Sequence, residues 1–230
     1  MLQRIQKLIG RKSLIGDHEF FTPSDFPWRT HLEANWQLIR AELERVLEHH
    51  DDLPHFQDIS PDQQHLARDR KWKTFFFFAY GLRSEANLSR CPRTAELITS
   101  VPGAKTAFFS ILAPHSHIPE HCGPYKGVIR YHLGLIVPKP ESACRIRVGQ
   151  TTAHWAEGKS MFFDDTFPHE VWNETDAQRV VLFMDVMRPL RFPVSVLNAI
   201  IIKAIAASPF IRDAKKNHEE WERRMSQIWN

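Results

Sequence analysis

Two histidines stand in segments whose residue types could do chemistry. His121 closes the run HSHIPEH, His169 lies within FFDDTFPHEVWN, and each follows a predicted turn and adjoins a predicted strand. The chain has 13 histidines among 230 residues, which raises the expectation of metal chemistry. Imidazole nitrogens suit iron, zinc, copper and nickel. Because most single histidines are not ligands, spacing alone leaves open whether these two meet at a metal ion.

An arginine and a histidine share one face of the predicted strand GVIRYHLGL, 127–135. Side chains alternate between the faces of a strand, so Arg130, His132 and Gly134 point to the same side. That side either meets water or lines a pocket. Gly134 favours the pocket, because glycine within a strand often marks close approach of a ligand or another backbone. The opposite side is predicted to be core and carries Ile129, Tyr131, Leu133 and Leu135.

A second arginine, Arg179, opens the predicted strand RVVLFMDV, 179–186. Both faces of this strand are mostly apolar, which is typical of a central strand. An arginine at the mouth of such a strand is expected to have an anionic partner. That partner is either a carboxylate of the protein or a bound dicarboxylate, which a guanidinium can bind with two hydrogen bonds.

A sheet-rich core must position these residues. From residue 105 onward, short apolar segments alternate with glycine, proline and Asp-Asp turns, which predicts a mainly β sandwich or barrel. The aromatic run KTFFFFAY, 73–80, predicts a further buried strand upstream. The predicted strands of the core are 105–112, 127–137, 144–150, 160–163, 169–173 and 179–187.

Helices are predicted on both sides of this core. Apolar residues recur at helical spacing over 34–49, and a proline begins a short helix over 92–100. Residues 51–64 read as a polar loop, and the paired charges of 212–224 predict a solvated helix. The expected single domain has N-terminal helices with a supporting strand (1–104), a β core (105–190) and a helical C-terminal extension (191–230).

Composition excludes some classes of protein. The net charge is only +3 and the basic residues are dispersed, which argues against nucleic-acid binding. Three cysteines without paired spacing argue against a disulfide framework and against a zinc ribbon. A reducing compartment, the cytoplasm, is therefore expected.

Two segments near the ends of the chain bear on membranes. Residues 1–16 are basic and amphipathic, but they lack the apolar run and cleavage site of a secretory signal. The apolar run 194–207 is shorter than the roughly 20 residues that a membrane-spanning helix needs. We expect a buried helix there in preference to an interfacial one, with peripheral membrane contact through both segments as the alternative.

Several motifs together resemble the aspartyl/asparaginyl β-hydroxylase family, which is related to the lipid A 2-hydroxylases. They are HCGPY at 121–125, RYHLGL at 130–135, FDDTFPHEVWN at 163–173, and the later Arg179 and Asp185-Val186. The segments WKTFFFF and CPRTAELI fit the region upstream, so the resemblance covers about residues 73–189. The run FDDTFPHEVWN is the most specific of these motifs.

The resemblance implies a double-stranded β-helix of the jelly-roll or cupin kind. It also implies a dioxygenase that hydroxylates its substrate with Fe(II), O2 and 2-oxoglutarate, supported by ascorbate. His121 and His169 fall on the family's iron ligands, and Arg179 on the residue that binds the distal carboxylate of 2-oxoglutarate. Further co-substrate contacts fall on Ser110, Arg130 and His132.

One position departs from the wider class, which uses two histidines and one carboxylate. The carboxylate normally stands two residues after the first histidine, where this chain has Gly123. The aspartyl/asparaginyl branch also has glycine there, with water in the vacancy, whereas the lipid A branch tends to keep an aspartate. We expect Asp165 to orient the iron-bound water, with a turn cap as its alternative role.

Other functions stay open at this point. A cupin-type metal site would use His115, His117 and Glu120 instead, but it leaves Arg179 unexplained. A binding module could keep the barrel without any activity. For a hydroxylase, we expect the substrate to be the β-carbon of an Asp or Asn side chain in a peptide or small molecule, which Gly123 favours, with an acyl chain of a membrane lipid as the alternative. The basic N-terminus and the apolar run 194–207 favour an acyl chain of a membrane lipid.

Overall fold

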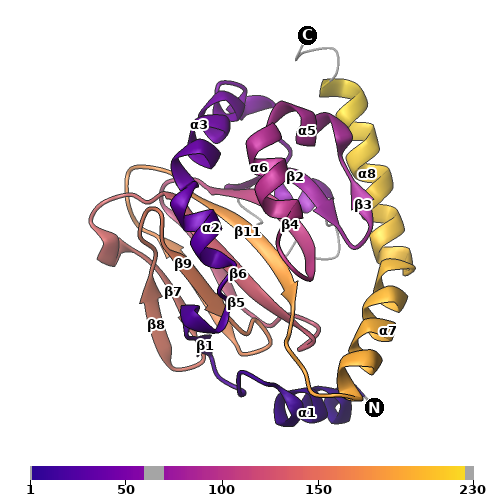
Figure 1. Cartoon of the computed structure of the whole chain (residues 1–230). Coiled ribbons are helices and arrows are strands. Elements are labelled where there is room, and N and C mark those ends of the chain that lie inside the picture. Colours follow the sequence, from indigo (N-terminus) through magenta and orange to yellow (C-terminus); the bar gives the residue numbers. More distant parts are fainter. Residues whose placement is uncertain (1, 60–69, 226–230) are drawn as a thin grey trace.

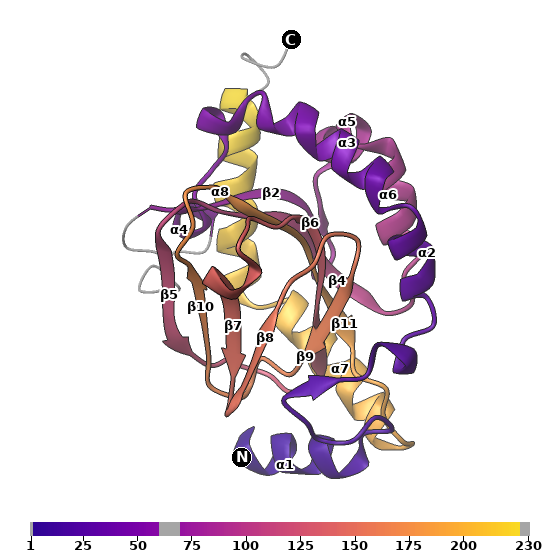
Figure 2. The same cartoon turned by 90° about the vertical axis from the view of Figure 1, so that its left-hand side faces the viewer.

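Two antiparallel sheets form the centre of the computed structural model, which describes residues 2–59 and 70–225 (Figure 1). The larger sheet has the spatial order β1 (Phe20–Phe21), β9 (Ser160–Phe163), β6 (Val128–Ile136), β11 (Arg179–Met187), β4 (Ala104–Leu112), β2 (Trp72–Ala79) and β3 (Leu82–Arg83). The smaller sheet has the order β5 (Ser116–His121), β10 (His169–Asn173), β7 (Cys144–Val148) and β8 (Thr151–His154), which lie side by side in Figure 2.

The chain passes back and forth between the two sheets. From β4 to β11 each strand lies in the sheet opposite to its predecessor, except that β7 and β8 are neighbours in the smaller sheet. This connectivity closes two antiparallel sheets around a common interior and defines a double-stranded β-helix. The predicted fold class is confirmed, with helices before and after the strands.

Alternation along the central strands separates two cores. One face of β6 and β11 packs against the covering helices, and it includes the four residues of β6 that the sequence predicted to be core. The other face turns into the space between the sheets, where Val181 and Phe183 pack against residues of the smaller sheet. His132 is 5% exposed on this inner face, so this side of β6 lines the interior and not the solvent.

Four helices cover the outer face of the larger sheet (Figure 2): α2 (Arg29–Ala34), α3 (Trp36–Leu47), α5 (Glu85–Arg90) and α6 (Pro92–Thr99). A buried carboxylate joins two of them. Glu42 of α3 accepts hydrogen bonds from the backbone amides of Arg93 (3.0 Å) and Thr94 (2.8 Å) at the start of α6. The partial positive charge of a helix N-terminus stabilises such an anion. The CPRT motif therefore holds the helical layer together at a distance from the interior.

The remaining helices lie at one end and along one side of the molecule (Figure 1). Helices α1 (Leu2–Lys12) and α7 (Val194–Ala206) are in contact at that end, and α8 (Pro209–Met225) runs along the side, where it meets α4 (Phe56–Ile59). Among the described residues, no single helix is long and apolar enough to span a membrane. Helix α7 and residues 211–223, whose axes differ in direction by 49°, would together have the length and apolar composition of a membrane span.

Most predicted elements of the sequence are present with shifted ends. The six predicted core strands correspond to β4, β6, β7, β9, β10 and β11, and the upstream strand to β2. The helix predicted over 34–49 begins at Trp36 as α3, and the one over 212–224 belongs to the longer α8. The loop predicted over 51–64 contains α4, and its part beyond residue 59 lies outside the described residues.

The prediction of a buried helix over 194–207 is wrong. Helix α7 buries Val194, Asn198 and Ile202, but Val196 is 50% exposed and Ile200 is 59% exposed. An apolar run of this length indicates a helix, but it does not show which of its faces has a partner.

Candidate active site

His121 and His169 lie opposite each other on adjacent strands. His121 is the last residue of β5, His169 is the first residue of β10, and the antiparallel register pairs the two directly. Their ring centroids are 4.0 Å apart. Strand pairing thus brings together the two histidines that the sequence singled out.

Each imidazole ring is oriented by a hydrogen bond to the backbone carbonyl of the residue two positions before it. Nδ1 of His121 lies 2.8 Å from the carbonyl oxygen of Pro119, and Nδ1 of His169 lies 3.0 Å from that of Phe167. A carbonyl oxygen can only accept, so Nδ1 donates in each pair and Nε2 carries the lone pair of the neutral ring. Burial lowers the pKa of His169 to about 4, which keeps this ring neutral. Two imidazole rings this close together are suited to hold a divalent metal ion.

No third protein ligand from the described part of the chain accompanies the pair. Within the described residues, no group of three or more His, Cys, Asp or Glu side chains is arranged to hold a metal ion. At Gly123, a Cβ atom would stand 2.1 Å from Oδ2 of Asp165, and the Gly123 amide donates to the Asp165 carbonyl at 2.6 Å. The Asp165 carboxylate therefore occupies the space that a side chain at position 123 would need.

Asp165 belongs to a buried ion network with Arg130. Nη2 of Arg130 lies 2.5 Å from Asp165, and Nε lies 2.8 Å from Asp185 on the neighbouring strand β11. The guanidinium also lies over the ring of Phe183, 4.1 Å from its centroid. Burial raises the pKa of both carboxyl groups, and the charge of Arg130 opposes that shift. Arg130 thus forms ion pairs with two carboxylates of the protein, although its Nε and Oδ1 of Asp185 do not meet in hydrogen-bond geometry, and the sequence did not reveal this pairing.

The turn-capping role considered for Asp165 belongs to its neighbour. Asp164 is 0% exposed and accepts hydrogen bonds from the backbone amide (3.0 Å) and hydroxyl (2.6 Å) of Thr166. Its other oxygen accepts from Lys126 at 2.7 Å and from Arg188. In the Asp-Asp pair, the first residue therefore fixes the turn and the second faces Arg130 and Gly123.

Arg179 also lies in the interior, and its surroundings differ from those of the half-buried Arg130. It is 2% exposed, yet its Nε and Nη1 groups have no hydrogen-bond partner in the structure. Its guanidinium lies over the ring of Trp155, 4.6 Å from the centroid, and contacts the thiol of Cys144. Burial without a nearby anion lowers the pKa of Arg179 to about 10. Unpaired donors of this kind are costly, so they mark a place where an anion can bind.

His132 adds another unpaired donor beside the same tryptophan. Nε1 of Trp155 lies 3.2 Å from Nδ1 of His132. Because an indole N–H only donates, Nδ1 of His132 accepts and its proton stands on Nε2. That Nε2 is buried without a partner, and burial holds the pKa of His132 well below its usual value. Trp155 therefore contacts two side chains, Arg179 and His132, that both present free N–H groups.

Ser110 lies on β4 and also has an aromatic partner. Its hydroxyl oxygen accepts a hydrogen bond of 3.0 Å from Nε1 of Trp72 on β2, which leaves the hydroxyl proton available for another acceptor. The sequence singled out Ser110 but not Trp155, and it gave no role to Trp72 or Asp185, although both stand in motifs of the resemblance. Each of these contacts its partner across strands or after a turn, so no local pattern marks it.

The residues of the cupin-type alternative lie outside the interior. His115 and His117 are exposed and lie 2.9 Å from Asp176 and 2.7 Å from Glu170. Glu120 forms an ion pair of 2.8 Å with Arg147. These three side chains do not converge on one point, which removes the geometric basis of that alternative.

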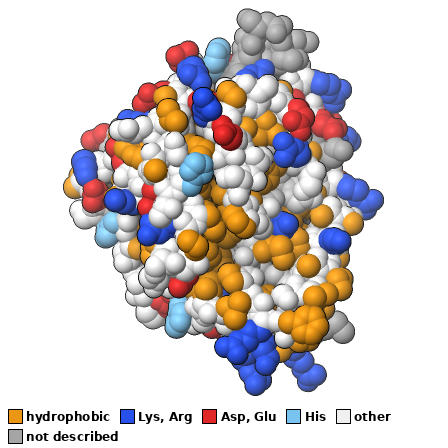
Figure 3. All heavy atoms as spheres, in the orientation of Figure 1, with side chains coloured by type: hydrophobic (Ala, Val, Ile, Leu, Met, Phe, Trp, Pro, Cys, Tyr) orange, Lys and Arg blue, Asp and Glu red, His pale blue; other side chains and the backbone are white. Residues whose placement is uncertain are grey.

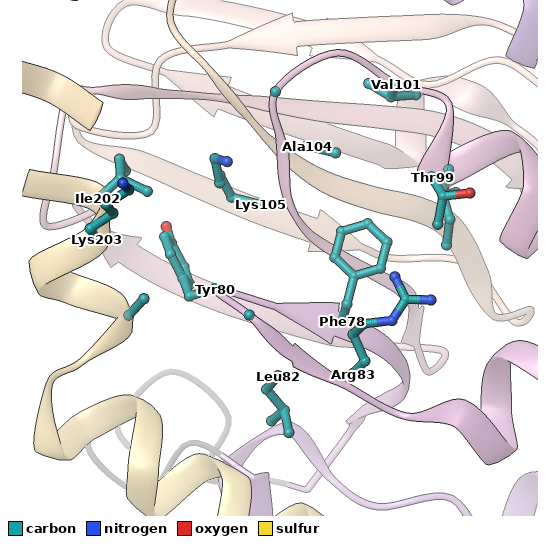
Figure 4. Close-up of a pocket in the computed structure, with 14 residues that line it drawn as sticks. Phe78, Tyr80, Leu82, Arg83, Thr99, Val101, Ala104, Lys105, Ile202 and Lys203 are labelled. Atoms are coloured by element: carbon teal, nitrogen blue, oxygen red, sulfur yellow. The ribbon is translucent and has the colours of Figure 1, made fainter. Parts of the chain in front are cut away.

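A groove of about 440 Å³ lies elsewhere, between α7, α6 and the hairpin of β2 and β3 (Figure 4). Its walls are mostly apolar, with Phe78, Tyr80 and Leu82 from the hairpin and Ile202 from α7. None of the predicted site residues lines this groove, so it is separate from the histidine pair.

Comparisons with known proteins place this geometry in context. The family model described as aspartyl/asparaginyl beta-hydroxylase matches residues 33–189. The ornithine lipid ester-linked acyl 2-hydroxylase of Rhizobium tropici is 45% identical over 210 residues, which cover 91% of this chain and 75% of that protein. The human aspartyl/asparaginyl beta-hydroxylase is 34% identical over 163 residues, which cover 69% of this chain but 21% of that protein. A solved Pseudomonas putida prolyl-4-hydroxylase matches 66% of this chain and 87% of its own, with a TM-score of 0.42 and 16% identity.

Proposed function

Because the chain belongs to the aspartyl/asparaginyl β-hydroxylase family, we propose that it is an Fe(II)- and 2-oxoglutarate-dependent hydroxylase that acts on an acyl chain of a membrane lipid. The observation that carries the co-substrate assignment is the buried Arg179, whose Nε and Nη1 have no partner. A dicarboxylate is the ligand that this arrangement fits best.

The distal carboxylate of 2-oxoglutarate would accept hydrogen bonds from Arg179 and from Nε2 of His132. A carboxylate and a guanidinium form strong, charge-assisted hydrogen bonds, and an anion here would satisfy donors that the fold leaves unpaired. Trp155 fixes both donors from one side. Ser110 is proposed to donate its free hydroxyl proton to the same ligand.

His121 and His169 would hold the iron through Nε2, and their hydrogen bonds to backbone carbonyls would keep the rings in that orientation. When bound, Fe(II) with O2 and 2-oxoglutarate supplies the oxidising power, and 2-oxoglutarate leaves as succinate and CO2. The Asp165 carboxylate occupies the space that a side chain at position 123 would need, and we propose that from there it orients a water molecule bound to the iron. Arg130 holds the Asp165 carboxylate in place. It could bind the co-substrate only if its ion pairs with Asp165 and Asp185 were broken.

The choice of a lipid acyl chain rests on the comparisons. The relative that is named for acyl 2-hydroxylation of ornithine lipid is 45% identical over 91% of this chain. The relatives named for aspartyl and asparaginyl residues are 32–35% identical over shorter parts. The higher identity to the lipid hydroxylase reverses the expectation of an Asp or Asn substrate, which rested on Gly123. Position 123 concerns the coordination of iron and not the shape of the substrate.

The second candidate substrate is an Asp or Asn side chain in a peptide, or a small molecule that contains it. Its support is the family itself, whose model covers 33–189, together with the glycine at position 123. Both candidates use the same iron and co-substrate sites, so only the product separates them. The cytoplasmic location expected from the cysteines stays a prediction.

One experiment tests the proposal as a whole. The protein is incubated under air with Fe(II), ascorbate and 2-oxoglutarate, and with vesicles that contain ornithine lipid or, in parallel, a peptide with Asp and Asn. Succinate is quantified, and mass spectrometry detects the addition of one oxygen atom. Hydroxylated lipid with matching succinate is the expected result, and His169→Ala is the inactive control. A hydroxylated peptide without hydroxylated lipid would show that the substrate is the peptide and not the lipid. Absence of succinate in every mixture would contradict the proposed use of 2-oxoglutarate.

A further inference from the structure

The exposed apolar side chains of the molecule gather at one end. Six large hydrophobic residues are notably exposed among the described residues, and only Leu38, on α3, stands apart from the other five. Those five follow α1 or belong to α7 and the loop before it: Leu14 (58%), Phe192 (83%), Val196 (50%), Leu197 (38%) and Ile200 (59%). On α7 the exposed residues form a stripe along the side opposite to Val194, Asn198 and Ile202, which are buried.

The same end is mainly basic, and the carboxylate of Asp17, which lies beside Gly10 of α1, is paired with Lys126 at 2.7 Å. Segments 1–16 and 186–212 have no Asp or Glu, and Figure 3 shows Lys and Arg side chains beside hydrophobic ones at the lower end of this face. The exposed basic residues of α1 form no ion pair with another described residue. They are Arg4, Lys7, Arg11 and Lys12, and Arg191 and Lys203 add to them from the other segment.

This end is attached to the loop that follows His121. Gln6 of α1 donates a hydrogen bond of 3.1 Å to the carbonyl of Pro124. Asn198 of α7 accepts from the Tyr125 hydroxyl at 2.7 Å and donates to the carbonyl of Gly127 at 2.9 Å. Both helices therefore hold the segment between His121 and β6. A surface that binds through α1 and α7 is therefore linked to the segment that follows His121.

We propose that α1, Leu14 and the stretch from Phe192 to Ile200 form a docking face that binds the surface of an anionic phospholipid bilayer. The role of this docking face rests on the proposed function, in which the substrate is a membrane lipid. Phe192 and the exposed stripe of α7 enter the interface between headgroups and acyl chains, and the basic residues of α1 contact the anionic headgroups. Docking would bring acyl chains to the loop after His121.

A second copy of the chain fits this face less well. A symmetric pair would place the acid-free, basic segments of two chains against each other, and like charges across an interface are repulsive. An anionic bilayer provides the opposite charge together with an apolar interior. The groove beside α7 shares Ile202 and Lys203 with the helix, so the apolar surface extends from the docking face toward the hairpin of β2 and β3 (Figure 4).

The test is sedimentation with vesicles of phosphatidylcholine alone and of phosphatidylcholine with phosphatidylglycerol. The wild type is expected to bind the anionic vesicles at least tenfold more tightly. Each basic residue near an anionic surface contributes roughly a fivefold gain in binding, so the double variant Lys7→Glu/Arg11→Glu should lose at least about twentyfold. The double variant Phe192→Ser/Ile200→Ser should lose at least about tenfold, because the apolar contact disappears.

Matched controls come from elsewhere on the surface. Leu38 is 49% exposed on α3, and Lys159 is exposed in a turn, so Leu38→Ser and Lys159→Glu remove the same chemistry outside the docking face. Both are expected to bind vesicles like the wild type. The proposal would be overturned if the wild type bound neutral and anionic vesicles equally. It would also be overturned if the control variants lost as much vesicle affinity as the variants of the docking face. A wild-type dimer in solution that Phe192→Ser/Ile200→Ser converts to a monomer would assign the face to a second copy.

The docking face and the proposed function can fail separately. Vesicle binding requires neither Fe(II) nor 2-oxoglutarate, and uncoupled succinate formation requires no vesicles. Wild-type protein that makes succinate but does not bind anionic vesicles would overturn the docking face alone. Wild-type protein that binds them but makes no succinate would leave the docking face in place and overturn the hydroxylase.

Discussion

Two arginines face the interior between the sheets, the half-buried Arg130 and the buried Arg179, and their surroundings are opposite. Arg130 lies between Asp165 and Asp185, at 2.5 and 2.8 Å, beside the segment that carries Gly123. Arg179 has an aromatic ring and a thiol beside it, and two of its N–H groups lack a partner. A charge that the fold satisfies internally supports the structure, whereas a charge that it leaves unsatisfied is available to a ligand. The same residue type therefore has a structural role in one region and a proposed binding role in the other.

The largest expected effect is on stability at Arg130. Replacement by methionine leaves Asp165 and Asp185 buried without their cation, which is expected to lower the free energy of unfolding by about 3–5 kcal/mol. Chemical denaturation of the protein without iron or co-substrate measures it. A change below about 1 kcal/mol would show that the network is not structural and would erase the contrast with Arg179.

A smaller loss of stability is expected at Gly123, since the space beside it is filled. A Cβ atom there would stand 2.1 Å from Asp165, so Gly123→Ala should lower the free energy of unfolding by about 1–3 kcal/mol. The double variant Gly123→Ala/Asp165→Ala should lose less than the sum of the single variants, because truncation of Asp165 opens the space. Additive losses in denaturant melts would contradict a direct clash.

A variant of Trp155 tests whether this side chain prepares the surroundings of Arg179 and His132 for a ligand. Trp155→Phe removes the N–H that bonds to Nδ1 of His132 but keeps a ring beside Arg179. The loss of one such hydrogen bond is worth about 1 kcal/mol, so the affinity for 2-oxoglutarate should fall about fivefold. Calorimetric titration measures this value. An unchanged affinity would mean that His132 is not oriented by Trp155 for binding.

The smallest effect is expected at the exposed histidines of β5 and its preceding turn. His115 and His117 are partnered by surface carboxylates, and exposed pairs contribute about 0–1 kcal/mol. The double variant His115→Ala/His117→Ala should keep iron binding and succinate formation within about twofold of the wild type. Loss of iron from this variant, with His121→Ala unaffected, would restore the cupin-type alternative.

The sequence located the histidine pair and Arg179 through the resemblance, and the alternation of β6 and β11 through their apolar patterns. It could not reveal Asp185 as a partner of Arg130, because that contact depends on the register between β6 and β11. It also missed β5 and β8, whose sequences SHIPEH and TTAH contain few apolar residues. They are the two edge strands of the smaller sheet, where hydrophobic alternation is weak.

The exposed face of α7 shows the same limit in another form. The apolar composition of 194–207 favoured a buried helix, yet burial depends on what the rest of the chain places against each face. Only one face of α7 meets the core cluster of Ile9, Tyr125 and Val128. The described residues leave much of the other face exposed, and this result could not follow from the helix sequence alone.

The most direct measurement of the central claim compares Arg179→Met with the wild type in two assays. Calorimetric titration of 2-oxoglutarate under argon, with Fe(II) present, measures affinity, and denaturation without ligand measures stability. Loss of the guanidinium should weaken binding by about 2–4 kcal/mol, roughly 30- to 1,000-fold, while the free energy of unfolding stays equal or rises. Unchanged affinity, or a loss of stability as large as that expected for Arg130→Met, would contradict the assignment of Arg179 as the site left open for a carboxylate.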